Sequence, residues 1–229
     1  MSERKSTGNW WQHAFTRFTT HWPLKSFGTI AYISAFMAVY FWLLRHPAFP
    51  VFTMPLTPLD RLIPFESWSL LPYATLWLYI SLVPALLHLR REMAPYLSAV
   101  TLLSLTGFAI FFFWPTAVPK PDVDWAQHPS IQFLKSVDTA GNACPSLHVA
   151  FAVLTALWLH RLLKHMAAPI LLQFINVAWC VLIAYSTLAT KQHVALDLET
   201  GALLGFAVAA LHLYVLPRFG VLDVALESA

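Results

Sequence analysis

Two short stretches in the second half of the chain contain residue types that handle phosphate. The first is "TKQHVALD", Thr190 to Asp197, in which His193 and Asp197 are four residues apart. If the stretch is helical, both side chains share one face, and Asp197 accepts the proton on one ring nitrogen of His193. The other ring nitrogen is then unprotonated and nucleophilic, and Lys191 adds positive charge nearby. This spacing predicts an activated histidine beside a cation.

The second stretch is "NACPSLH", Asn142 to His148. Pro145 is placed to start a helix, because proline is favoured in the first helical turn. The backbone N–H groups of Ser146 and Leu147 would then be free and point outward, and such a helix N-terminus binds anions. The hydroxyl of Ser146 and the imidazole of His148 would lie beside the same anion. Asn142 is a further candidate donor.

A third cluster, "PTAVPKP" at 115–121, contributes Lys120. Two histidines, two lysines, a serine and a helix N-terminus together suit phosphoryl transfer. The cations would hold the phosphate oxygens while one imidazole attacks and the other protonates the leaving group. Two residues also have plainer readings: Lys120 as a solvated loop lysine, and Ser186 as a serine that forms a hydrogen bond within its own helix.

The sequence "PSLH" and the spacing of Ser186, His193 and Asp197 resemble the second and third motifs of the type 2 phosphatidic acid phosphatase (PAP2) superfamily. Its members include six-helix membrane lipid phosphatases and phosphotransferases. The usual second motif is PSGH, and here Leu147 replaces the glycine. The usual third motif has Ser-Arg, five residues, His, three residues and Asp, and here Thr187 stands at the arginine position.

The first motif of that superfamily survives only as Lys120 followed by Pro121, with Phe113 where its lysine would be. These departures, together with "CPSLHVA", "TKQH" and "IPF" at 63–65, are more similar to the branch that contains inositol phosphorylceramide synthases. In that branch reading, Lys191 would replace the missing arginine charge.

The resemblance implies a role for each residue. His193 would be the nucleophile that forms a phosphohistidine, and Asp197 would orient it. His148 would be the acid toward the leaving alcohol and then the base that activates the acceptor. The residues expected to bind the phosphate are Lys120, Ser146, Lys191, Asn142, Leu147 and Ser186. This chemistry requires no metal and no cofactor.

The elements that position these residues are predicted to be membrane helices. The chain is 58% hydrophobic and 11% charged, whereas a soluble domain carries about a quarter charged residues. Continuous apolar runs without strict alternation favour helices over a barrel. Six runs approach the length needed to span a membrane: 26–44, 68–89, 94–114, 145–163, 169–190 and 196–217. The expected fold is all-α, a six-transmembrane helix bundle in which Gly201 and Gly205 provide a close packing face.

We expect a leader at 1–25, a six-helix membrane domain at 26–217 and a tail at 218–229. In the leader, aromatic residues recur at helical spacing and predict an amphipathic interfacial helix; a partly disordered leader is the alternative. These residues are Trp11, Phe15, Phe18 and Trp22. Two long loops, at 45–67 and 115–144, are expected on the same side as the turn at 191–195.

Nine of the fourteen Lys and Arg residues fall on the side of the termini. The positive-inside bias therefore predicts cytoplasmic termini and an active site on the outer face, most simply of a bacterial inner membrane. The net charge of +3 is spread along the chain and does not suggest a nucleic-acid partner.

We expect a lipid-phosphate phosphatase whose partners are its lipid phosphate substrate and the membrane lipid. The alternatives are a phosphotransferase that uses an alcohol such as inositol or a lipid, and a non-catalytic binder or transporter.

Overall fold

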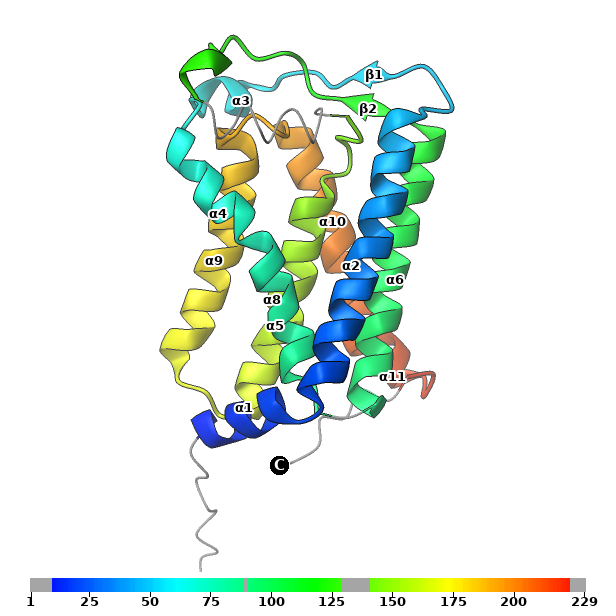
Figure 1. The fold of residues 1–229 in the computed structure, drawn as a ribbon, viewed down its shortest axis with the longest axis vertical. Coiled ribbons are helices and arrows are strands. Elements are labelled where there is room, and N and C mark those ends of the chain that lie inside the picture. The colour runs from blue at the N-terminus through cyan, green and yellow to red at the C-terminus, as the bar shows by residue number, and fades with distance from the viewer. Residues whose placement is uncertain (1–9, 89, 129–140, 223–229) are drawn as a thin grey trace, which may run out of the picture.

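The computed structural model describes residues 10–88, 90–128 and 141–222 (Figure 1). Within these ranges, six helical segments are long and apolar enough to cross a membrane. They are Trp22–Arg45, Ser67–Leu86, Glu92–Phe113, Leu147–His165, Ile170–Ala189 and Ala195–Arg218. Each overlaps one of the spans predicted from the sequence. The all-α fold with six spans is therefore confirmed, and the chain is an integral membrane protein.

Four spans are continuous helices: α2 (Trp22–Arg45), α6 (Arg90–Phe113), α8 (Leu147–His165) and α9 (Ile170–Ala189). The second span joins the 3-10 turn η1 (Ser67–Ser69) to α4 (Leu70–Ala74) and α5 (Leu76–Leu86). The last joins α10 (Ala195–Ala210), the π-helical turn η3 (Leu211–Val215) and α11 (Leu216–Arg218). Between α4 and α5, the hydroxyl of Thr75 accepts a hydrogen bond from the Trp179 indole at 2.9 Å, which connects this junction to α9.

Helix α8 lies at the centre of the bundle and packs against α10, α9, α5 and α6. Two glycines allow α10 to approach it closely. A Cβ atom at Gly201 would collide with the carbonyl of Ser146, and one at Gly205 would collide with the carbonyl of Ala150. The predicted glycine packing face is therefore confirmed.

Helix α1 (Trp10–Thr19) lies across the end of the bundle (Figure 1). Its exposed aromatic side chains are Trp11, Phe15 and Phe18. Arg17 is buried and forms an ion pair with Glu92 of α6 at 2.8 Å, and Lys25 of α2 donates a hydrogen bond to the carbonyl of Arg17 at 2.5 Å. A helix in the leader is thus confirmed for residues 10–19, while residues 1–9 lie outside the described ranges. Its position at a membrane surface stays a prediction.

The two long connections meet at the opposite end of the bundle (Figure 1). Strand β1 (Phe52–Thr53) pairs in parallel with β2 (Thr116–Ala117). The first connection also contains α3 (Pro58–Leu62), and the second contains the 3-10 turn η2 (Trp125–Gln127). No sequence pattern predicted this small sheet. Its backbone hydrogen bonds join the two loops over the end where the predicted site residues lie.

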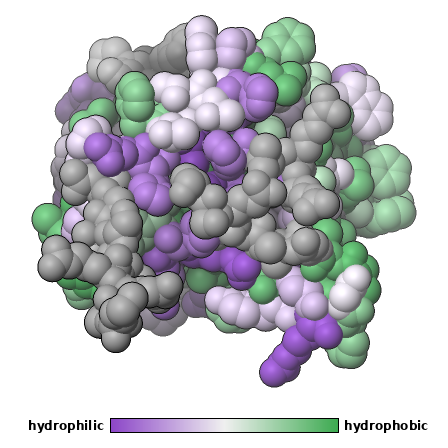
Figure 2. Space-filling model, turned by 90° about the horizontal axis from the view of Figure 1, so that it is seen from below, coloured by the Kyte–Doolittle hydropathy of each residue, from purple (hydrophilic) through white to green (hydrophobic). Residues whose placement is uncertain are grey.

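The end of the bundle that carries α1 and α11 presents both hydrophilic and hydrophobic side chains. Figure 2 shows this end from below, with hydrophilic side chains gathered near its middle and hydrophobic side chains toward its edge. Such a pattern suits the end of a membrane bundle, because polar groups face water there while the apolar sides of the helices face lipid.

Candidate active site

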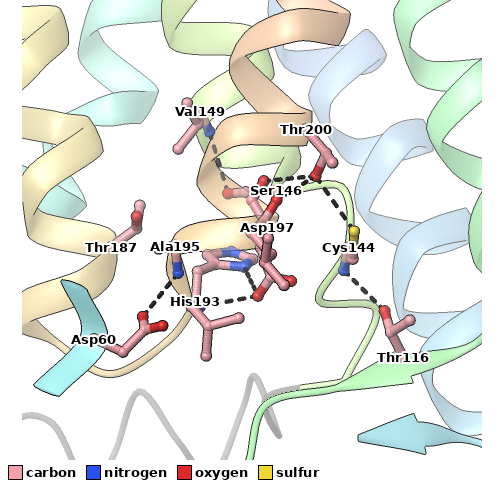
Figure 3. Close-up of polar contacts among 12 residues, drawn as sticks. Asp60, Thr116, Cys144, Ser146, Val149, Thr187, His193, Ala195, Asp197 and Thr200 are labelled. Carbon is pink, nitrogen blue, oxygen red and sulfur yellow. Dashed lines mark hydrogen bonds and ion pairs between the residues drawn. The ribbon is translucent and has the colours of Figure 1, made fainter. Parts of the chain in front are cut away.

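The first turns of α8 and α10 are joined through their backbones. The N–H of Ser146 donates a hydrogen bond to the carbonyl oxygen of Asp197 at 2.9 Å. The two helices approach this closely because Gly201, one turn further along α10, has no side chain to hold them apart. The "PSLH" stretch and the "TKQHVALD" stretch therefore form one structure (Figure 3).

His193 lies in the turn between α9 and α10. The carbonyl of Thr187 accepts hydrogen bonds from the N–H groups of Gln192 and His193, both at 3.1 Å, so the turn folds back onto the end of α9. Lys191 has a φ of 57°, in the left-handed region that residues other than glycine seldom occupy. The reversal at Lys191 directs the chain toward the start of α10.

The stretch is not yet helical at His193, because α10 begins only at Ala195, so the condition for a shared helical face is not met. Asp197 is instead in the first turn, where its Oδ2 accepts a hydrogen bond from the N–H of Val194 at 2.9 Å. The same oxygen is 3.5 Å from Nδ1 of His193. The two side chains are thus neighbours, although by a different geometry from the one predicted.

The distance between His193 and Asp197 is long for a hydrogen bond. Among the described residues, neither His193 Nδ1 nor Asp197 Oδ1 has a hydrogen-bond partner, and both side chains are buried. Buried polar atoms of this kind usually have partners, so a small movement that closes this pair would be favourable. Catalytic hydrogen bonds commonly shorten in this way when a substrate binds.

The imidazoles of His148 and His193 lie close to each other. Their ring centroids are 5.6 Å apart, and the ring planes are inclined at 59°. His148 comes from the first turn of α8 and His193 from the turn before α10, so the convergence of the two stretches predicted from the sequence is observed. Nδ1 of His193 is on the side of Asp197, which leaves Nε2 as its other available nitrogen. One phosphoryl group can lie within reach of both rings.

The N-terminus of α8 differs in detail from the prediction. The helix begins at Leu147, and Ser146 is its N-cap residue, whose hydroxyl oxygen accepts a hydrogen bond from the N–H of Val149 at 3.4 Å. The expectation that the Ser146 N–H is free is wrong, because it binds the Asp197 carbonyl. Within the described ranges, the N–H groups of Leu147 and His148 have no hydrogen-bond partner. The candidate anion donors are therefore the N–H groups of Leu147 and His148, instead of those of Ser146 and Leu147.

The N-termini of α8 and α10 also differ in charge. At α10, the carboxylate of Asp197 binds the N–H of Val194, and the carboxylate of Asp60 binds the N–H of Ala195 at 2.8 Å (Figure 3). Two negative groups therefore offset the positive end of that helix dipole. Helix α8 has no acidic residue in its first turn. An anion would consequently be bound more favourably at α8 than at α10.

Lys191 contacts the first outer loop. Its Nζ donates hydrogen bonds to the carbonyl oxygens of Asp60 at 3.3 Å and Ile63 at 2.5 Å. Burial lowers the pKa of Lys191, and the negative charge of Asp60 partly opposes this shift. These contacts connect α3 to the turn that carries His193. A role for Lys191 in holding phosphate oxygens stays a prediction.

In the described part of the chain, three of the predicted phosphate ligands make no contact with the histidine pair. Asn142 donates from Nδ2 to the carbonyl of Tyr40 at 3.3 Å, toward the end of α2. The hydroxyl of Ser186 donates to the carbonyl of Ile183 at 2.6 Å, which is its plainer reading. Lys120 is exposed beyond β2. The side chain of Leu147 belongs to the apolar core, so only its backbone can contact an anion.

Two residues beside the site were not identified from the sequence. The ring of Tyr73 in α4 stacks on His148, with centroids 4.6 Å apart and planes inclined at 30°. The second is Asp60 of α3, whose carboxylate accepts a hydrogen bond from the N–H of Ala195 and so caps the first turn of α10. Neither shares a motif with the histidines. The sequence indicated only that the first loop lies on the same side of the membrane as the turn at 191–195.

Cys144 is also part of this region. Its N–H donates to the hydroxyl of Thr116 at 2.8 Å, and its Sγ lies 3.3 Å from the hydroxyl of Thr200 on α10 (Figure 3). Burial raises the pKa of the Cys144 thiol, and the nearby charge of Asp197 adds to this effect. A neutral thiol here connects the second loop to α10.

The comparisons with known proteins agree with the motifs. The family model of the PAP2 superfamily matches residues 92–220, more than half of the chain, and this range contains both histidine-bearing stretches. Searches of curated proteins and of solved structures gave no match. The chain belongs to the PAP2 superfamily, as a membrane protein of the lipid phosphatase or phosphotransferase kind.

Proposed function

We propose that this protein is a lipid-phosphate phosphatase that acts through a phosphohistidine on His193. The observation that supports this most directly is the pair of imidazoles, His148 and His193, whose centroids are 5.6 Å apart beside the N-terminus of α8. An imidazole on each side of one phosphoryl group suits nucleophilic attack from one ring and proton transfer at the other.

In the first half-reaction, Nε2 of His193 attacks phosphorus and forms a P–N bond while the bond from phosphorus to the lipid oxygen breaks. Protonated His148 gives its proton to that oxygen, so the lipid leaves as an alcohol. Asp197 stabilises the positive charge that develops on His193. The N–H groups of Leu147 and His148 bind the phosphoryl oxygens, in which negative charge increases.

In the second half-reaction, neutral His148 takes a proton from water as the water oxygen attacks phosphorus. The P–N bond breaks, its electron pair returns to His193, and inorganic phosphate leaves. His148 is protonated again, so both histidines return to their starting states.

We place this site on the outer face of the membrane, with both termini in the cytoplasm, most simply in a bacterial inner membrane. The support is the excess of Lys and Arg in the segments at the end of the bundle that carries α1. The lipid phosphate would then be taken from the outer leaflet.

Transfer to an alcohol is the second candidate. It is favoured by the departures from the usual third motif, in which Thr187 stands where an arginine is expected. The hydroxyl of Thr187 donates to the carbonyl of Ala184 at 2.7 Å and brings no positive charge. This chemistry shares the first half-reaction, and an alcohol such as inositol or a lipid replaces water in the second.

The test is incubation of the purified protein with phosphatidic acid and isoprenoid pyrophosphate, with and without alcohol acceptors, followed by mass spectrometry. His193→Ala should lower phosphate release by about a thousandfold or more. Label from radioactive substrate should be trapped on the wild-type protein and be missing from this variant.

His46→Ala is the matched control, because His46 is an exposed histidine at the end of α2 and should leave turnover unchanged. Unchanged turnover in His193→Ala would refute the nucleophile assignment. Products that contain the added alcohol would favour the transferase, and binding without any turnover would favour a non-catalytic binder.

A further inference from the structure

A cavity of about 530 Å³ lies within the membrane-spanning part of the bundle, between α2, α5, α6 and α8. Its walls are almost entirely apolar. They include Gly28, Ile33, Phe36, Trp77, Leu97 and Phe151. The size falls within the range of about 300–1,000 Å³ that is typical of small-molecule sites in proteins.

Helix α2 forms one wall of the cavity and is most deeply buried near its two ends. Its buried residues are Lys25 near one end and Tyr40 and Leu43 near the other. Lys25 is held by a hydrogen bond from its Nζ to the carbonyl of Ala85 at 3.0 Å. The residues between these anchors are exposed or half-buried. Midway along α2, the ring of Phe36 contacts Phe108 of α6 and Phe151 of α8, with centroids 5.0 Å and 5.3 Å apart, so aromatic side chains bound the cavity on this side.

One end of the cavity is the candidate active site. His148 and Tyr73 belong to its lining, and Phe151 follows His148 on the same face of α8. A molecule that fills the cavity therefore has an imidazole at one end and apolar side chains along the rest of its length. This distribution matches an amphiphile with a single polar head.

The cavity extends from the site past the middle of the membrane. Gly28 and Tyr40, which both line it, are separated by a helical rise of about 18 Å along α2. This is somewhat more than half of the roughly 30 Å hydrocarbon core. At the far end, Gly28 and Leu97 are exposed on the lateral surface of the bundle. The cavity is therefore open to lipid at its far end, in the half of the bundle that carries α1.

We propose that this cavity holds the hydrocarbon tail of the lipid phosphate, taken from the leaflet that contains the site, so that the head group lies at His148. The proposal rests on the proposed function, because it assumes that the molecule processed at His148 is a lipid. It adds that the substrate is recognised by its tail as well as by its phosphate. The depth of the cavity sets the chain length that fits best.

The expected preference for one chain length comes from the shape of the cavity. A tail in the bilayer is already in an apolar solvent, so its transfer into the cavity gains little hydrophobic free energy. A side chain that occupies the cavity would exclude the end of a long tail, whereas a short tail would still fit. The structure therefore predicts that blocking the far end changes the ranking of substrates by chain length and leaves the chemistry intact.

The test variant is Gly28→Trp, which introduces a large side chain at the far end. A Cβ atom at Gly28 meets nothing within 4 Å, so the helix itself tolerates the change. Leu97→Trp on α6 blocks the same end from the other wall. The matched control is Ile30→Trp, because Ile30 is exposed on the same stretch of α2 and does not belong to the cavity lining.

The assay is phosphate release from phosphatidic acids with short, medium and long acyl chains. Gly28→Trp should lower kcat/KM for the long-chain substrate by about tenfold or more relative to the short-chain substrate. Ile30→Trp should keep the wild-type ranking. Equal effects of Gly28→Trp on all chain lengths would overturn the proposal.

A binding measurement separates this proposal from the enzymatic one. A phosphatidic acid with a photoreactive group at the end of its chain should label α2 and α6 near Gly28 and Leu97. The labelling should be the same in His193→Ala. If the wild-type protein is labelled near Gly28 and Leu97 but shows no turnover, the tail site is supported and the proposed enzymatic function is refuted. Turnover with labelling confined to the outer surfaces of the helices would refute the tail site alone.

Discussion

Replacing Gly201 by alanine tests whether the contact between α10 and α8 holds the two catalytic stretches together. The added Cβ atom would collide with the carbonyl oxygen of Ser146, and it would also lie 3.2 Å from the Cβ atom of that residue. The obstructing oxygen belongs to the backbone, so no side-chain rotation can relieve the collision. The two helices must separate or the first turn of α8 must distort.

The expected magnitude follows from two opposing effects. Alanine favours a helix over glycine by about 1 kcal/mol. Overpacking of this kind costs about 1–3 kcal/mol, so the net change ranges from about zero to a loss of about 2 kcal/mol. The effect on turnover should be larger, because a displacement of about 1 Å at a reacting group can cost about a hundredfold. The displaced groups are His193 and His148, whose supports are joined by the hydrogen bond from Ser146 to Asp197.

The assay combines thermal unfolding in detergent micelles with phosphate release from phosphatidic acid. Leu203→Ala is the control, because Leu203 is exposed on the same helix and should leave turnover near wild type. We expect Gly201→Ala to lose activity far out of proportion to its loss of stability. If both variants keep wild-type turnover, the packing of α10 on α8 does not control the geometry of the site.

Two further predictions concern residues around the histidines. Tyr73→Ala should lower kcat about twofold to tenfold, the value of an aromatic stack, while Tyr73→Phe should stay near wild type. Equal losses in both variants would show that the hydroxyl matters instead of the ring. The pKa of Lys191 is lowered by burial, so in the alkaline range below its ordinary value of 10.5 the unfolded chain binds more protons than the folded protein. Stability should therefore rise with pH in that window in the wild type and rise less steeply in Lys191→Met, as measured by thermal unfolding at a series of pH values. Identical slopes in the two proteins would refute the assignment to Lys191.

The sequence by itself determined that lipid surrounds most of the chain and that the fold is a bundle of membrane helices. Apolar runs of sufficient length specify membrane helices regardless of how they pack, because every backbone polar group must be satisfied within its own segment. The glycine pair at 201 and 205 likewise indicated a close helix contact, because small residues on one face of a helix allow close approach whichever helix packs there. The types and spacing of His148, His193 and Asp197 were enough to predict that they converge.

Only the tertiary structure decided how these residues are held. Where α10 begins depends on two carboxylates, and one of them, Asp60, comes from a loop that is distant in sequence. Lys191 contacts that same loop, and Tyr73 stacks on His148 across a helix junction. No local pattern encodes such contacts, because each depends on the relative placement of separate helices. The apolar cavity has the same origin, since residues of several separate helices line it.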